Sequence, residues 1–110
     1  MMVELVAYTD DAGEAPFVEW LSGIDRQAVN RVTIALDRLE GGNTGQLKSL
    51  GGGVHELRIP FGPGYRIYLG QDGERLVILL TGGTKRRQSR DIERARGLWT
   101  DYKLKKKRKD

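Results

Sequence analysis

The chain has 110 residues, no cysteine, a single histidine and a formal net charge of +4. This length suits one domain with its own core, and the lack of cysteine excludes disulfides, thiolate nucleophiles and cysteine-bound metal centres. His55 alone cannot build a histidine metal site. No segment matches a signal peptide or a membrane span, so we expect a cytoplasmic protein that uses no metal, no cofactor and no membrane.

The basic charge is concentrated in the C-terminal quarter of the chain. Residues 1–80 carry 7 basic and 11 acidic side chains, residues 81–102 carry 6 and 3, and residues 103–110 carry 6 and 1. A positive pole of this kind favours a polyanionic partner such as nucleic acid. A solvated helix end would explain the last eight residues equally well. We divide the chain into a domain over 1–102 and a basic C-terminal tail over 103–110.

The N-terminal part predicts one strand and two helices. Residues 2–8 alternate apolar and polar side chains, as a strand does. Pro16 suits the first position of a helix, and Asp25 can cap a second helix that Gly41 and Gly42 end. Apolar residues recur at helical spacing in both segments: Phe17, Trp20, Leu21 and Ile24 in the first, and Val29, Val32, Leu36 and Leu39 in the second. The two helices are expected to form a hairpin.

The C-terminal part predicts three strands and a helix. Residues 43–53 are rich in glycine and read as a loop, after which two alternating runs, 54–59 and 65–70, flank the turn PFGPG. The run LVILLT at 76–81 suits a strand buried on both faces in the middle of the sheet. A final helix carries an apolar face of Ile92, Ala95, Trp99 and Tyr102. The order β-α-α-β-β-β-α predicts an α+β domain, with an antiparallel sheet packed by the helical hairpin and the last helix.

Strand parity predicts a polar patch on the hairpin. If the PFGPG turn closes symmetrically, Arg58 faces Arg66, Glu56 faces Tyr68, and Ile59 faces Tyr65. Like charges directly opposite each other destabilise a sheet, so the two arginines favour a bound anion. Alternatively, Glu56 neutralises one arginine and the other is solvated.

Two further cations, Lys85 and Arg86, follow the apolar run and should lie near this patch. The four cations could surround one phosphodiester. Metal-free RNA cleavage also needs a base for the 2′-hydroxyl and an acid for the leaving oxygen. Guanidinium groups are poor bases, so a lysine of lowered pKa, Glu56, Tyr68 or His55 remains. His55 shares a strand face with Leu57 and is predicted to be structural.

The segments GGGVHELRIPFGPGYRIYLG and LVILLTGGTKRRQSRDIERARGLW carry a resemblance that extends from FVEWL to the last helix. They resemble the RelE/HigB toxin family, in its branch of addiction module killer proteins. The resemblance implies a RelE-like fold and the toxin of a type II toxin-antitoxin system. Such a toxin is a ribosome-dependent mRNA interferase that cuts messages in the ribosomal A site. Its partners would be the ribosome, mRNA and a cognate antitoxin protein, with no small-molecule cofactor.

The resemblance assigns catalysis to Arg58, Arg66, Lys85 and Arg86. The chain departs from the better-known pattern of the family, because Glu56 stands where a lysine base often sits and the early C-terminal helix lacks a tyrosine. Gln88 and Asp91 occupy that region instead. The possible acid or base is therefore one of Glu56, Tyr68 and Asp91. RNA binding is expected from seven cations: Lys48, Arg87, Arg90, Lys103, Lys105, Lys106 and Lys107.

Two other functions fit the same sequence. A ParE-like protein would use this fold to inhibit DNA gyrase without cutting RNA. A nucleic-acid-binding module without enzymatic activity would rely on the lysine tail as its main contact.

Overall fold

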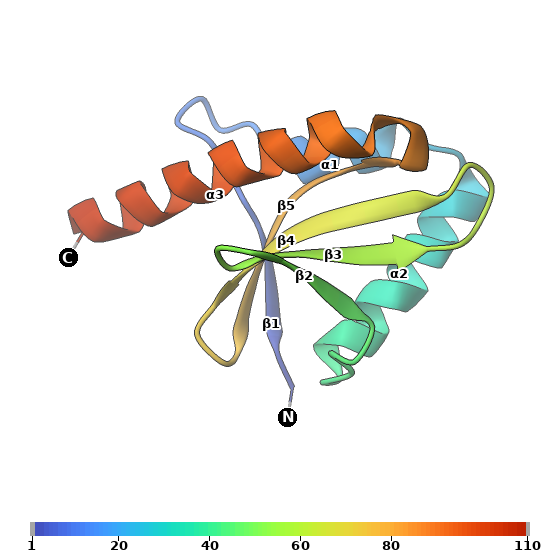
Figure 1. The fold of residues 1–110 in the computed structure, drawn as a ribbon, viewed down its shortest axis with the longest axis horizontal. Helices are drawn as coiled ribbons and strands as arrows, with labels where there is room; N and C mark the ends of the chain where they lie inside the picture. The colour runs from blue at the N-terminus through green and yellow to red at the C-terminus, as the bar shows by residue number, and fades with distance from the viewer. Residues whose placement is uncertain (1, 110) are drawn as a thin grey trace.

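The computed structural model of the chain describes residues 2–109 and has the predicted α+β class. It contains a five-stranded sheet and three α-helices (Figure 1). Of the helices in this described part, none combines the length and the apolar character that crossing a membrane requires. The elements in chain order are β1 (Glu4–Ala7), α1 (Pro16–Ser22), α2 (Arg26–Glu40), β2 (Leu47–Gly51), β3 (Val54–Ile59), β4 (Tyr65–Asp72), β5 (Leu76–Thr84), the 3₁₀ turn η1 (Lys85–Arg87) and α3 (Gln88–Lys109).

The sheet is mixed, with the strand order β1-β5-β4-β3-β2. Strand β1 pairs with β5 in parallel, whereas the other neighbours are antiparallel. The prediction of a wholly antiparallel sheet is therefore wrong at β1. Alternation along a strand indicates which residues share a face, but it carries no information about the partner strand or its direction. The apolar run of β5 does lie between two neighbours, as its composition predicted.

Strand β2 lies inside the segment that was predicted to be a loop. It is a short edge strand whose pairing with β3 shifts between Ser49 and Gly51. The turn that follows has positive φ at three successive glycines, with values of 88°, 67° and 88° at residues 51–53. Only glycine adopts such a run without strain. Polar residues and glycines are common in edge strands. In β2 they take the place of the alternating apolar residues from which a strand is predicted, so this strand was not expected.

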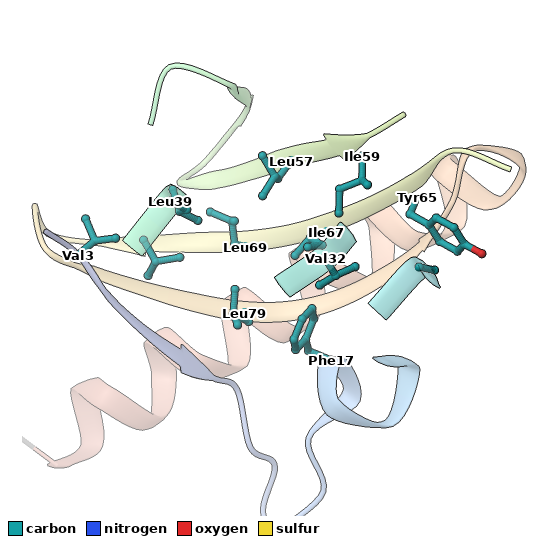
Figure 2. Close-up of a cluster of buried hydrophobic side chains, with 12 residues drawn as sticks. Val3, Phe17, Val32, Leu39, Leu57, Ile59, Tyr65, Ile67, Leu69 and Leu79 are labelled. Carbon is teal, nitrogen blue, oxygen red and sulfur yellow. The ribbon is translucent and has the colours of Figure 1, made fainter. Parts of the chain in front are cut away.

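Two cores cover opposite faces of the sheet. The first lies between the sheet and helices α1 and α2, where Phe17, Val32 and Leu39 meet side chains such as Ile67 and Leu79 (Figure 2). The second lies under α3, whose Ala95 and Trp99 were predicted to face the sheet. Helix α3 continues to Lys109, so the basic tail from residue 103 is helical over its described part. Figure 1 shows this end of α3 extending beyond the strands.

The second core depends on a close approach between β4 and α3. A Cβ atom added to Gly70 would lie 2.2 Å from Cε3 of Trp99. We expect Gly70→Ala to lower the free energy of unfolding by about 1–3 kcal/mol, since the ring must move out of a packed site. Gly97 of α3 is exposed, and a Cβ there would meet nothing within 4 Å. Gly97→Ala should raise the same quantity by up to about 1 kcal/mol. Urea denaturation of both variants measures the difference, and equal stability of the two would contradict this account.

Candidate functional site

The register of the β3–β4 hairpin is the one that strand parity predicted. Arg58 pairs with Arg66, and Glu56 pairs with Tyr68, while Ile59 pairs with Tyr65. Tyr68 belongs to the core under α3. Side chains of paired residues point to the same face of a sheet, so the two arginines and Glu56 also lie on the α3 side.

The carboxylate of Glu56 joins three side chains of this patch. Nε of Arg58 donates to Oε1 of Glu56 at 2.7 Å, and Nε of Arg66 lies 3.6 Å from the same oxygen. Nε2 of Gln88, at the start of α3, donates to Oε2 at 2.9 Å. Glu56 is fully buried, the Arg66 side chain is 8% exposed and that of Arg58 is 53% exposed. The negative charge between the facing arginines offsets their mutual repulsion without an external anion.

These contacts determine the charge state of Glu56. Burial raises its pKa, but the hydrogen bonds from Arg58 and Gln88, together with the charges of Arg66 and Arg58, outweigh that effect and leave the pKa below its ordinary value of 4.5. Glu56 is therefore an anion at neutral pH, enclosed by donors. The alternative prediction was that Glu56 neutralises one arginine while the other is solvated. It describes this site in part, because Arg58 is exposed to solvent but Arg66 is buried.

A second carboxyl group lies over the end of β5. Asp91 of α3 is buried, and a Cβ atom on Gly83 would lie 1.9 Å from its Oδ2 atom, so only glycine permits this approach. Burial raises the pKa of Asp91, although the positive charges of Arg87, Arg94 and Arg90 oppose the shift. The role of Gly83 was not predicted from the sequence. The pattern that could have indicated it is the pair of glycines at the end of an apolar run.

Three buried polar atoms in the described residues have no hydrogen-bond partner in the protein: Nη1 of Arg66, the Tyr68 hydroxyl and Oδ2 of Asp91. Burial, followed by the charges of Glu56 and Asp91, raises the pKa of Tyr68 to about 12. The Tyr68 hydroxyl therefore stays protonated at neutral pH. Because buried polar groups without partners are costly, their presence near one face of the sheet marks a candidate functional site.

A basic rim borders this site at the start of α3. A hollow of about 620 Å³ is lined by Lys85, Arg86, Arg87, Gln88, Ser89 and Arg90. The backbone N–H of Lys85 donates to the carbonyl oxygen of Gly64 at 2.8 Å, which holds the end of β5 against the PFGPG turn. Lys85 and Arg86 are exposed and lie at this end of the hairpin. Of the four predicted catalytic cations, Arg66 is thus buried and the other three are exposed.

The predicted RNA-binding lysines have different surroundings. Lys48 is exposed on β2 and pairs in register with Glu56, so it lies at the edge of the same face. In α3, Lys105 contacts Asp11 and Asp101 at 3.0 Å each, and Lys106 contacts Asp72 at 2.7 Å. Intramolecular pairing therefore occupies these two lysines. Lys103 lies over the ring of Trp99, whereas Lys107 is exposed.

His55 is half-buried in β3, and burial lowers its pKa, so it is neutral at physiological pH. This placement agrees with the structural role predicted for it. Between residues 2 and 109, histidine and acidic side chains do not gather in threes as metal ligands would.

The lowered pKa of Glu56 predicts how stability depends on pH. A carboxyl group with a depressed pKa stabilises the fold above its unfolded pKa, and the stabilisation is lost as the pH falls toward the folded pKa. The stability difference between wild type and Glu56→Gln should therefore be largest near neutral pH and shrink below about pH 4.5. Chemical denaturation across this range measures it. Glu74→Gln, at an exposed turn residue, is the control, and a matching pH profile for both variants would refute the role assigned to Glu56.

No protein-family model matches the chain. An uncharacterized protein of Haemophilus influenzae is 43% identical to it over 81 residues, which cover 73% of this chain and 82% of the relative. Similarity of this degree, over most of both chains, shows common descent. The chain therefore belongs to the same protein family as this Haemophilus influenzae protein.

Proposed function

We propose that the chain is a metal-independent endoribonuclease, the toxin of a type II toxin-antitoxin system of the RelE/HigB kind, which cleaves mRNA on the ribosome. The observation that carries the proposal is the facing pair of Arg58 and Arg66, held by buried Glu56 beside the basic hollow at the start of α3. The proposal includes a RelE-like topology, in which β2 is an additional edge strand.

In this proposal the exposed Arg58 contacts the scissile phosphate, with Arg86 at the rim. The 2′-oxygen loses its proton to the base and forms a bond to phosphorus, while Lys85 donates a proton to the 5′-oxygen as the bond from that oxygen to phosphorus breaks. Arginine donates two parallel hydrogen bonds to phosphate oxygens, and lysine acts as a compact charge. Arg66, behind Arg58, contributes positive charge from within the protein, where the lower dielectric strengthens its field. Glu56 positions the arginines, because its carboxylate is buried and already accepts hydrogen bonds from Arg58 and Gln88.

Proton transfer is assigned to Asp91. Glu56 is enclosed by donors, and Tyr68 is fully buried with a pKa of about 12, so neither suits a base that meets the 2′-hydroxyl. Asp91 lies at the start of α3 beside the basic rim and lines a hollow there with Thr84 and Arg87, which gives its carboxyl group a route to a ligand although its unpartnered Oδ2 is buried. Its pKa is raised. A raised pKa makes a carboxylate a stronger base than an ordinary aspartate.

The proposed partners are mRNA, the ribosome and a cognate antitoxin protein. Exposed cations near the site, among them Lys48, Arg87 and Arg90, would contact RNA phosphates, with Lys103 and Lys107 further along α3. Each neutralised phosphate releases counterions, so ribosome affinity should fall as salt rises.

The arginine pair is tested by two variants. Arg58→Ala and Arg66→Gln should each lower the rate of mRNA cleavage on translating ribosomes by about 10²–10³-fold, because the first removes a guanidinium that contacts the phosphate and the second removes the buried positive charge beside it. Primer extension on the message reports cleavage and its position. Arg26→Ala, an exposed arginine of α2, is the control and should cleave like wild type. A wild-type protein that leaves translated mRNA intact would refute the proposal, and DNA damage with unimpaired translation would favour gyrase inhibition.

The role of Asp91 is tested by its pH dependence. Asp91→Asn should slow cleavage by about 10²–10⁴-fold, since a general base contributes roughly that much. In wild type the rate should rise with pH through the raised pKa of Asp91, and in Asp91→Asn that step should disappear. Tyr68→Phe removes only a buried hydroxyl and should keep the pH profile. Retention of the pH step in Asp91→Asn would exclude Asp91 as the base.

A further inference from the structure

A hollow near the C-terminal end of α3 lies outside the candidate site. Its volume is about 350 Å³, which falls in the range of small-molecule sites. It is lined by Gln71 and Asp72 at the end of β4 and by side chains of α3 between residues 99 and 107. Tyr102 in this hollow lies about 20 Å along the helix from Gln88, at a rise of about 1.5 Å per residue. One nucleotide therefore cannot reach both the hollow and the cluster that Gln88 joins.

An aromatic pair forms one wall of the hollow. The rings of Trp99 and Tyr102 are stacked at an angle of 6°, with their centroids 5.2 Å apart. Nε1 of Trp99 donates to the carbonyl oxygen of Gly52 at 2.9 Å, and the Tyr102 hydroxyl donates to Oδ2 of Asp72 at 2.6 Å. Trp99 is buried whereas Tyr102 is half-buried, so the accessible ring surface belongs mainly to Tyr102. The hollow thus has a preformed flat wall on which a planar heterocycle can stack.

Three lysines line the hollow, and two of them are available to an anion. Lys106 contacts Asp72 at 2.7 Å, so the charges of this pair offset each other. Lys103 and Lys107 are exposed, and within residues 2–109 neither forms a salt bridge. Nζ of Lys103 lies 5.7 Å from the centroid of the Trp99 ring, which places its charge beside the aromatic wall. Positive charge and an aromatic surface therefore meet in one hollow.

We propose that this hollow binds a nucleoside phosphate, with the base against Tyr102 and the phosphate on Lys103 and Lys107. Aromatic side chains beside cations are the means by which proteins bind unpaired nucleotides without sequence preference. Gln71 is exposed and lines the same hollow, and its amide can both donate to and accept from the edge of a base. The two available lysines disfavour a cationic ligand. The aromatic wall favours a nucleoside phosphate over inorganic phosphate.

The nucleoside phosphate can be a free nucleotide or an unpaired nucleotide within an RNA strand, since both present the same base and phosphate. In the second case the hollow is a further contact for the RNA that the candidate site cuts, and that case alone rests on the proposed function. A second contact on one strand forms intramolecularly, so it raises the affinity for a strand that reaches both sites.

The probes are adenosine 5′-monophosphate, inorganic phosphate and a short 2′-O-methylated oligoadenylate, which an enzyme that needs a free 2′-hydroxyl cannot cut. Binding to the full chain is measured by isothermal titration calorimetry and by the indole N–H signals of the two tryptophans in NMR spectra. Adenosine monophosphate should shift the signal of Trp99. It should leave the signal of Trp20 in place, because Trp20 packs on the opposite face of the sheet.

Two variants test the two halves of the site. Lys103→Glu with Lys107→Glu should weaken binding of adenosine monophosphate at least about 10-fold, because both phosphate contacts become repulsive. The control, Arg26→Glu with Arg108→Glu, changes the net charge equally at exposed arginines outside the hollow and should bind like wild type. Tyr102→Leu should weaken binding about 10–100-fold, since stacking of a base on an aromatic ring contributes about that factor. Its affinity for inorganic phosphate should not change. Circular dichroism verifies folding, and the charge variants decide the test if Tyr102→Leu is unfolded.

Three outcomes would overturn the proposal: no shift of the Trp99 signal with either nucleotide probe, equal binding by the two charge variants, or equal affinity for inorganic phosphate and adenosine monophosphate. Tighter binding of the oligoadenylate than of the monophosphate supports an RNA strand as the ligand, and equal binding supports a free nucleotide. The mRNA cleavage assay separates the two proposals. A wild-type protein that binds the nucleotide at Trp99 but cuts no RNA keeps this site and refutes the proposed function. One that cuts RNA but binds no nucleotide at Trp99 does the reverse.

Discussion

The polar site on this sheet depends on the interactions of one buried group, the carboxylate of Glu56. It brings together β3, β4 and α3 through Arg58, Arg66 and Gln88. Without it, two like charges would face each other across neighbouring strands, one of them on a buried side chain. Burying the carboxylate is itself unfavourable, and the hydrogen bonds from Arg58 and Gln88, together with the charge of Arg66, compensate for that cost. The two arginines can therefore coexist on this hairpin because an anion is built in between them.

One face of the sheet packs on the apolar core that stabilises the molecule, and the other face carries the polar site. One face packs on α1 and α2 through apolar side chains, as Figure 2 shows. On the other face, Trp99 packs closely over Gly70, and toward the start of α3 the aliphatic side chains of β5 give way to Gly83. Gly83 leaves room for the carboxyl group of Asp91. The same strand thus supports a core along most of its length and a polar site at its end.

Much of this arrangement could be predicted from the sequence, because it depends on local rules. The alternation of VHELRI and YRIYLG and the short turn between them determine the pairing of Arg58 with Arg66. The parallel pairing of β1 depends on contacts distant in sequence, and β2 resembles a loop. The pairing of Lys105 with Asp11 and of Lys106 with Asp72 also required the structure, since the partners are far apart in the chain. A run of basic residues therefore did not indicate which cations are available to a ligand.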